Sequence, residues 1–193
     1  MKPQYIKETL LERTIVVIAE RGLDKTTTKA IVTGTGINEG YIYRYFADKE
    51  DLLAKAFDVL DEELKEKATE LLPVMYREDL SQEEKWHTLF CGMWAFLLGK
   101  RDRCLAFVQY YYSPYFVKNS YDAHVMRYQN LTQELSKACI EEADVWMILN
   151  YILNVMLDFA VKVHNNQMRS EDAYSEHVFR VIYVAVKQYF KQS

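Results

Sequence analysis

Proline and glycine are scarce in this chain, with 3 Pro and 6 Gly among 193 residues. Both residues mark turns and interrupt regular structure, so their scarcity argues against many short strands and favours helices. Cysteine is scarce as well. The three cysteines, Cys91, Cys104 and Cys139, are odd in number and far apart, which does not fit a disulfide framework or a paired-cysteine motif. We expect them to be buried small apolar residues rather than redox centres or metal ligands.

The chain also lacks a long uncharged apolar run. Its longest uncharged stretches, such as 145–157, are shorter than the roughly 18 residues that a membrane-spanning helix needs. The N-terminal residues hold no apolar segment of the kind that directs secretion. We therefore expect a cytoplasmic protein with no membrane partner. Hydrophobic residues nevertheless make up 50% of the chain, which is enough to build a core.

A large positive charge is missing too. The net charge is −4, which argues against non-specific coating of nucleic acid but leaves room for a local basic face. Residues 1–50 carry eight basic and seven acidic residues, whereas the remainder carries 16 basic and 21 acidic residues. This weak asymmetry has the sign expected of a DNA-binding segment attached to an acidic body.

Helical periodicity accounts for nearly all of the chain. Apolar residues recur every three to four positions, and no segment shows sustained period-two alternation. Residues that cap helices precede the apolar stripes at Thr27, Asn38, Asp48, Ser81 and Ser170. The predicted fold class is all-α, with about nine helices. Their approximate ranges are 4–21, 27–35, 38–45, 48–72, 81–97, 101–112, 120–142, 144–166 and 170–191.

The first fifty residues contain a helix-turn-helix pattern, in which a glycine-containing turn separates the second and third of three short helices. Gly36 permits this turn because it has no Cβ. The residues that carry the pattern are Ala19–Leu23, Thr27, Ile31, Gly36–Gly40 and Tyr43–Leu53. Taken together, they resemble the TetR family of bacterial transcriptional regulators over about residues 4–64.

This resemblance implies a DNA-binding head at residues 1–47, joined through the fourth helix to a ligand-binding and dimerisation domain at 48–193. The third helix would enter the major groove of DNA by its N-terminal residues, and Gly40 would let it approach closely. Thr27, at the start of the second helix, would bind a phosphate. The predicted DNA-binding residues are Thr27, Lys29, Asn38, Glu39, Gly40, Tyr41, Tyr43, Arg44, Tyr45 and Lys49.

These residues are expected to have different roles. The residues placed near base edges are Asn38, Glu39 and Tyr41. The residues placed near phosphates are Tyr43, Arg44, Tyr45 and Lys49. For the two tyrosines at 43 and 45 the alternative is half-buried helix packing, and Phe46 is expected in the core.

Two positions of the third helix depart from the family pattern. Glu39 stands where family members often carry Lys, and Tyr41 is bulky at a position that is often small or polar. An acid repels phosphate but can accept a hydrogen bond from a cytosine amino group. The departures therefore bear on the operator sequence rather than on DNA binding itself.

The residues after 73 hold no recognisable motif, but they are rich in aromatic side chains. These rings are either ordinary core or the lining of a cavity for a planar or lipophilic ligand. The predicted ligand-binding residues are Trp86, Phe90, Trp94, Phe107, Tyr110, Tyr111, Trp146, Asn150, Asn154 and Asp158.

Three of these residues, Asn150, Asn154 and Asp158, recur at intervals of four on one face of the otherwise apolar helix 144–166. A buried carboxylate without a partner is costly. Asp158 therefore faces a ligand pocket, a dimer partner or solvent, and the sequence leaves the three alternatives open. In a pocket, it would favour a cationic or hydroxyl-bearing ligand.

Sequence features of enzymes and metal sites are absent. The histidines at 87, 124, 164 and 177 lack the spacing of known zinc motifs. No nucleophile elbow or phosphate-binding glycine loop occurs. We therefore expect no enzyme activity, no cofactor and no metal site.

The predicted function is a DNA-binding transcriptional regulator, a repressor that a small lipophilic or aromatic effector releases from a palindromic operator. The family resemblance implies a homodimer that forms through the last two helices, at about 144–166 and 170–191. The alternative is a regulator or adaptor of the same fold that a protein partner controls.

Overall fold

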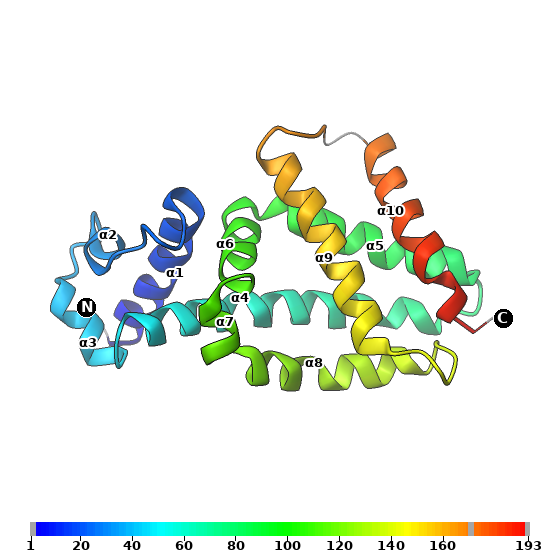
Figure 1. The fold of residues 1–193 in the computed structure, drawn as a ribbon, viewed down its shortest axis with the longest axis horizontal. Coiled ribbons are helices and arrows are strands. Elements are labelled where there is room, and N and C mark those ends of the chain that lie inside the picture. Colours follow the sequence, from blue (N-terminus) through cyan, green and yellow to red (C-terminus); the bar gives the residue numbers. More distant parts are fainter. Residues whose placement is uncertain (1–2, 170–171, 192–193) are drawn as a thin grey trace. The chain divides into compact units, whose positions relative to one another are not determined.

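The structure is a computed structural model that describes residues 3–169 and 172–191. The described residues form ten α-helices and no strand, which confirms the all-α prediction (Figure 1). The helices are α1 (Pro3–Arg21), α2 (Thr28–Val32), α3 (Ile42–Tyr45), α4 (Lys49–Leu71), α5 (Gln82–Gly99), α6 (Arg101–Tyr111), α7 (Pro114–Asn119), α8 (Tyr121–Ser136), α9 (Val145–His164) and α10 (Asp172–Val186). Short 3₁₀ turns at Glu39–Tyr41, Leu72–Tyr76 and Lys187–Tyr189 precede α3 and follow α4 and α10.

Side-chain caps explain where several helices begin. Thr27 accepts a hydrogen bond from the backbone of Ala30, and Asp48 accepts one from the backbone of Asp51. Ser81 forms a capping box at the start of α5. Each cap satisfies an N–H group that the first turn of a helix leaves unpaired. These caps confirm the predicted starts; the predicted cap at residue 170 lies outside the described residues.

Several helix boundaries differ from the predictions. The second helix ends at Val32 instead of near residue 35, and α10 ends at Val186 instead of near residue 191. Pro114, expected only to end a helix, opens α7, because proline fits the first turn of a helix, where no N–H partner is needed. The helix expected over 120–142 ends at Ser136. The residues that follow pair with the end of the chain instead, since Ile140 donates its N–H to the carbonyl of Tyr189 at 2.9 Å.

The contacts between residues divide the chain into two compact units. Unit 1 contains the residues up to Glu63 together with Asp102–Met126, and unit 2 contains Leu64–Arg101 together with the residues from Arg127 onward. This division follows packing. The functional boundary predicted near residue 47 is a separate matter and stays a prediction.

In unit 1, α6 holds α1 and α4 through polar contacts. The Arg103 guanidinium donates through Nη2 to Glu12 of α1 at 2.9 Å and through Nε to Glu63 of α4 at 2.8 Å. The backbone N–H of Leu23, just after α1, donates to the Gln109 side chain at 2.9 Å. Because arginine presents a planar fork of donors, one residue fixes both helices.

An aromatic core fills the interior of unit 1. The Phe57 ring stacks on Tyr110 with 4.8 Å between ring centroids and also contacts Phe107 and Phe116. Beside these rings, Asp61 and His124 form a hydrogen bond of 2.9 Å, with side chains 0% and 2% exposed. This buried polar pair joins α4 to α8.

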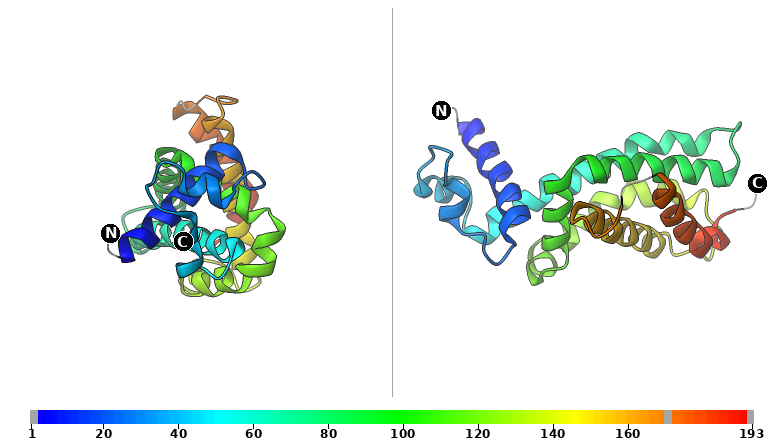
Figure 2. Two further views of the ribbon diagram at one scale, coloured as in Figure 1. Left: turned by 90° about the vertical axis from the view of Figure 1, so that its left-hand side faces the viewer. Right: turned by 90° about the horizontal axis from the view of Figure 1, so that it is seen from above.

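In unit 2, α5, α9 and α10 lie side by side (Figures 1 and 2). Their buried rings include Trp86, which stacks on Phe190 at 4.2 Å, and Phe90, which contacts Phe179 at 5.5 Å. The core of unit 2 is therefore built where these three helices meet.

The cysteines differ in their surroundings. Cys104 and Cys139 are buried, as expected, and burial raises the pKa of the Cys104 thiol to about 12. Cys91 is exposed, so the expectation that all three are buried was wrong. Its helix, α5, turns this position outward while Phe90 and Trp94 turn inward.

One described helix, α9, is long and apolar enough to cross a membrane by length and composition alone. The helix α9 is longer than the uncharged stretch 145–157, because it continues through Asp158 and Lys162 to His164. Only 22% of its most apolar window is buried within the chain. A single helix of this kind is weak evidence for a membrane protein.

Candidate DNA-binding surface and ligand cavity

A small apolar core fixes the three helices of the head. Residues from α1, α2, α3 and the start of α4 meet in it, and the buried members are Ile6, Leu10, Ile31, Ile37, Ile42, Phe46 and Leu52. Phe46 is 3% exposed, which confirms its predicted place in the core. The core holds α2 and α3 in one arrangement, so that the side chains on their outer surfaces keep fixed positions.

The turn between α2 and α3 depends on glycine. Gly34 and Gly36 have φ angles of +80° and +71°, a region in which a Cβ would be strained. Asn38 then caps the first 3₁₀ turn of the third helix by accepting from the N–H of Gly40 at 2.9 Å. The sequence thus specifies both the turn and the start of the third helix.

Most of the predicted DNA-binding side chains lie at the surface of the head. The exposed members of the set are Thr27, Lys29, Asn38, Glu39, Gly40, Tyr43 and Arg44. Lys49 is half-buried at the start of α4. Tyr43 is 59% exposed, whereas Tyr45 packs partly against the apolar core. The structure therefore separates the two tyrosines, one free at the surface and one half-buried in packing.

Two contacts occupy side chains of the third helix. Thr28, the first residue of α2, donates a short hydrogen bond to the carboxylate of Glu39. The Arg44 guanidinium lies over the Tyr41 ring, 5.2 Å from its centroid, a cation–π arrangement. Thr28 was missed at the sequence level, and the run of three threonines at 26–28 could have pointed to it.

Unit 2 contains a partly open apolar cavity of about 110 Å³. Its walls come from the end of α4 and from α5, α8, α9 and α10. The lining residues are Ala68, Leu72, Trp86, Leu89, Phe90, Met93, Leu131, Leu135, Leu149, Ile152, Met156, Phe179, Ile182, Tyr183, Val186 and Phe190. Only the tryptophan and the tyrosine carry a polar side-chain atom, so the cavity suits an apolar group.

Trp86 adds one polar feature to this lining. Its side chain is 8% exposed, and its Nε1–H has no hydrogen-bond partner among the described residues. An unsatisfied buried donor costs about 1–3 kcal/mol. A ligand with an acceptor oxygen near this nitrogen would remove that cost.

Two of the ten predicted ligand-binding residues, Trp86 and Phe90, line the cavity. Three others, Phe107, Tyr110 and Tyr111, belong to unit 1. The first two are buried in its aromatic core and the third stacks on Phe107 at 5.5 Å. These three residues therefore pack against other rings and do not line this cavity.

The remaining five predicted residues also lie outside the cavity lining. Trp94 is buried and stacks on Phe90, and Trp146 contacts Tyr128 edge-on. Asn150 donates to the backbone carbonyl of residue 146, one turn earlier in its own helix. Asn154 is half-buried and is not among the lining residues.

For the Asp158 side chain, the sequence left three alternatives open, namely a ligand pocket, a dimer partner and solvent. Its side chain is 58% exposed and forms an ion pair with Lys162 at 2.5 Å, and it does not line the cavity. Within one chain it therefore lies at the surface. The aliphatic residues of α8, α9 and α10 that do line the cavity were missed, because a search for aromatic and polar side chains cannot tell which apolar residues surround a void.

Comparison with known proteins bears directly on the head. Residues 10–56 match the family model of bacterial regulatory proteins of the tetR family. The head is similar to the heads of TetR-family regulators. This confirms the resemblance on which the helix-turn-helix assignment rested.

A curated TetR-type relative is similar over a longer segment. The chain is 33% identical over 76 residues to the fatty acid metabolism regulator protein of Bacillus subtilis (strain 168), a match covering 35% of this chain and 38% of that protein. The matched part thus spans less than half the length of this relative. Its name denotes a regulator, not an enzyme.

Solved structures extend the similarity to the whole fold. A TetR family transcription regulator from Marinobacter aquaeolei VT8 has a TM-score of 0.74 at 15% identity, covering 93% of this chain and 94% of that one. The regulator FadR from Bacillus subtilis, in complex with stearoyl-CoA, has a TM-score of 0.70 at 21% identity, covering 91% and 96%. At these identities the similarity establishes a TetR-type fold for the body.

Proposed function

We propose that this protein is a transcriptional repressor that binds a palindromic operator as a homodimer and leaves it when an effector with an apolar chain enters unit 2. The observation that carries the proposal is the combination of a head that matches the TetR family with an apolar cavity in the body. A head alone would support DNA binding, and the cavity adds a place for an effector.

The exposed polar residues of the head form the proposed DNA surface. Tyr43 and Arg44 of α3 supply phosphate contacts, and Lys29 of α2 adds a positive charge beside them. Asn38 and Glu39 begin the third helix, the part that enters the major groove in helix-turn-helix proteins. Because Glu39 accepts from Thr28, one of its oxygens is held in place. It can accept from a base amino group with the other.

The proposed dimer interface is the exposed apolar face of α9 and α10. It contains Met147 and Tyr151 on α9, and Tyr174, Val181 and Val184 on α10, all of them exposed in the single chain. Large apolar residues gathered on two neighbouring helices mark a surface that another protein covers. A second copy would bury this face and bring two heads together for the two half-sites of a palindrome.

The proposed effector is a molecule with a fatty acyl chain. The cavity is almost wholly apolar, and the structural relative FadR holds stearoyl-CoA. A void of about 110 Å³ is smaller than the roughly 150 Å³ that holds benzene, so a long chain must displace lining side chains. Met93 and Met156 in the wall are suited to this, because methionine adapts its shape at little cost.

Release from DNA follows if the effector favours a conformation in which the two heads no longer fit successive major grooves. Ala68 of the cavity wall and Lys49 of the DNA surface belong to the same helix, α4. A shift of that helix can thus reach both sites. The size of the effect is limited by the difference in the effector's affinity for the two conformations.

The test is selection of bound sequences from random DNA by the full chain, followed by titration of the selected operator with fatty acyl-CoA esters of increasing length. We expect a palindromic operator and release by long chains but not by CoA alone. Release by no acyl compound, with DNA binding intact, would favour the alternative of control by a protein partner.

A further inference from the structure

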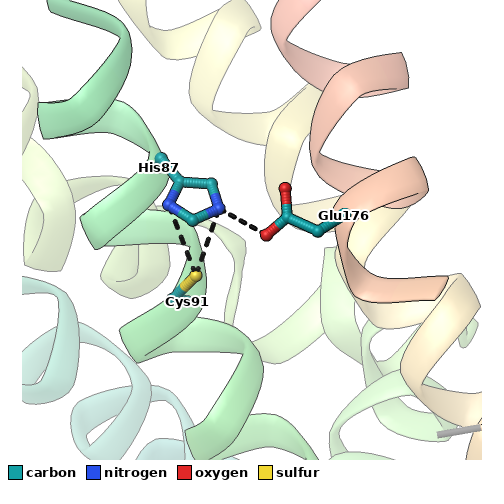
Figure 3. A group of neighbouring side chains, drawn as sticks. All are labelled: His87, Cys91 and Glu176. Carbon is teal, nitrogen blue, oxygen red and sulfur yellow. Dashed lines mark hydrogen bonds and ion pairs between the residues drawn. The ribbon is translucent and has the colours of Figure 1, made fainter. Parts of the chain in front are cut away.

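A cluster of three potential metal ligands lies in unit 2, outside the cavity. His87 and Cys91 lie one turn apart on α5, and Glu176 faces them from α10 (Figure 3). One ligand atom from each residue lies within 4.8 Å of the other two. Because the cluster joins two helices, only the fold brings it together. We expected no metal site because the histidines lack zinc-motif spacing, and that spacing cannot reveal a cluster whose members come from two separate helices.

A single tetrahedral ion requires two side chains to move. The Cys91 side chain must turn, because its Sγ lies 3.6 Å from Nε2 and 3.8 Å from Nδ1 of His87, beside the ring rather than in front of either nitrogen. Sulfur and nitrogen bound to one tetrahedral Zn²⁺ are about 3.6 Å apart, given bonds of about 2.3 and 2.05 Å. His87 Nε2 and Glu176 Oε1 are 2.6 Å apart in a direct hydrogen bond, whereas two such ligands of zinc lie roughly 3.3 Å apart. The glutamate must therefore retreat by about 0.7 Å.

The glutamate can make this movement. Its side chain is 46% exposed and that of His87 is 36% exposed, so the hydrogen bond between them opens toward solvent. The His87 ring meets the Phe179 ring edge-on at a centroid distance of 4.7 Å, which limits its movement. Cys91 is exposed as well, so the thiol and the carboxylate are the two ligands that adjust around the ring.

The donor set selects the kind of ion. A thiolate, an imidazole and a carboxylate together suit Zn²⁺ and its analogue Co²⁺, whereas Mg²⁺ and Ca²⁺ prefer oxygen ligands alone. We propose that His87, Cys91 and Glu176 form a Zn²⁺ site that joins α5 to α10, with water as the fourth ligand. Zinc replaces the proton between the imidazole and the carboxylate, and both this proton and the proton of the Cys91 thiol pass to solvent.

This site has a consequence for the body of the protein. The sequence neighbours Trp86 and Phe90 on α5 line the cavity, and so does Phe179 on α10. An ion that joins the two helices would hold two walls of the cavity together. The proposal does not depend on the identity of the effector or on DNA binding.

The first experiment is titration of the reduced, chelator-treated full chain with Co²⁺, followed by displacement with Zn²⁺. We expect one ion per chain and the near-ultraviolet absorption of a cobalt–thiolate bond. The Cys91→Ser variant should lose this absorption, and Glu176→Gln should weaken Zn²⁺ binding at least tenfold. His177→Gln, a change on the same helix outside the cluster, is the matched control and should bind as the unchanged chain does.

The second experiment measures protection of the thiol. Zn²⁺ should slow the alkylation of Cys91 by iodoacetamide, followed by mass spectrometry, and should raise the melting temperature of the unchanged chain but not of Cys91→Ser. Circular dichroism checks that each variant is folded. Absence of a cobalt–thiolate band, or Zn²⁺ affinity unchanged in both Cys91→Ser and His87→Gln, would overturn the proposal.

Discussion

Tyr43 and Tyr45 lie two positions apart near the end of the third helix, yet their surroundings differ. Tyr43 is 59% exposed, whereas the Tyr45 ring packs partly on the core of the head. The sequence Tyr-x-Tyr-Phe shows that all three rings occur near this helix end, and it correctly places Phe46 inside. It does not tell which of the two tyrosines is exposed. Residues two apart on a helix point about 200° apart, and the packing of α1 and α2 decides which side is buried.

The first prediction concerns the hydroxyl of Tyr43. If it donates to a phosphate, Tyr43→Phe should weaken operator binding about 10- to 150-fold, because one hydrogen bond to a charged group contributes about 1.5–3 kcal/mol. The loss should be nearly equal for different operator sequences, because phosphate contacts carry no sequence information. Fluorescence anisotropy with several operator variants measures it. Tyr45→Phe is the control and should have a smaller effect. A loss that varies strongly with sequence would contradict the assigned role.

The second prediction concerns the buried pair of Asp61 and His124, which hydrogen bond at 2.9 Å. Asp61→Ala removes one partner from a buried polar pair and should cost about 3 kcal/mol. For a chain of this size that lowers the melting temperature by roughly 6–12 °C. Asp79→Ala makes the same change in an exposed pair with Arg77 and should leave the melting temperature almost unchanged. Equal shifts in the two variants would mean that the buried pair is not a structural contact.

At the scale of elements, the sequence predicts a helix well where its signal is local. The caps at Thr27, Asp48 and Ser81 act through side chains three residues from their partners, so the sequence carries the whole interaction. The end of α8 at Ser136 was not predictable in this way. Its cause is a hydrogen bond between Ile140 and Tyr189, nearly fifty positions apart. The cavity was unpredictable for the same reason, since its walls come from five helices.

The third prediction concerns the turn before the third helix. Gly36 has a φ angle of +71° and open space where a Cβ would be, so Gly36→Ala is opposed only by backbone strain of about 1–2 kcal/mol. We expect a melting temperature lower by roughly 2–8 °C. Gly99→Ala is the control, since it also has open space but no positive φ angle. Thermal denaturation followed by circular dichroism compares the two. A Gly99→Ala variant destabilised as much as Gly36→Ala would show that the left-handed backbone is not the cause.

At the scale of the whole molecule, the apolar faces of α9 and α10 are exposed to solvent in a single chain. Only 22% of the most apolar window of α9 is buried within one chain, and α10 exposes Val181 and Val184 at 59% and 64%. Either a membrane or a second copy of the chain could bury these apolar faces, but the two require different helices to be apolar on the outside. A membrane needs one long helix, whereas a dimer uses both neighbouring helices together, and both carry exposed apolar residues here. The exposed face of α10 is therefore the observation that favours the dimer.

The last prediction tests this interface. The double change Val181→Glu and Val184→Glu places two charges on the exposed face of α10, where a partner chain would bury them at high cost. We expect sedimentation to show a particle of about 22.9 kDa instead of one twice as heavy, and operator binding to be lost with the dimer. Removal of residues 168–193 should have the same result. Val117→Glu is the matched control, because Val117 is 73% exposed but lies on α7, and it should leave both properties unchanged. A stable dimer in both the double variant and the truncated chain would place the interface elsewhere, and the two-helix face would then need a different partner.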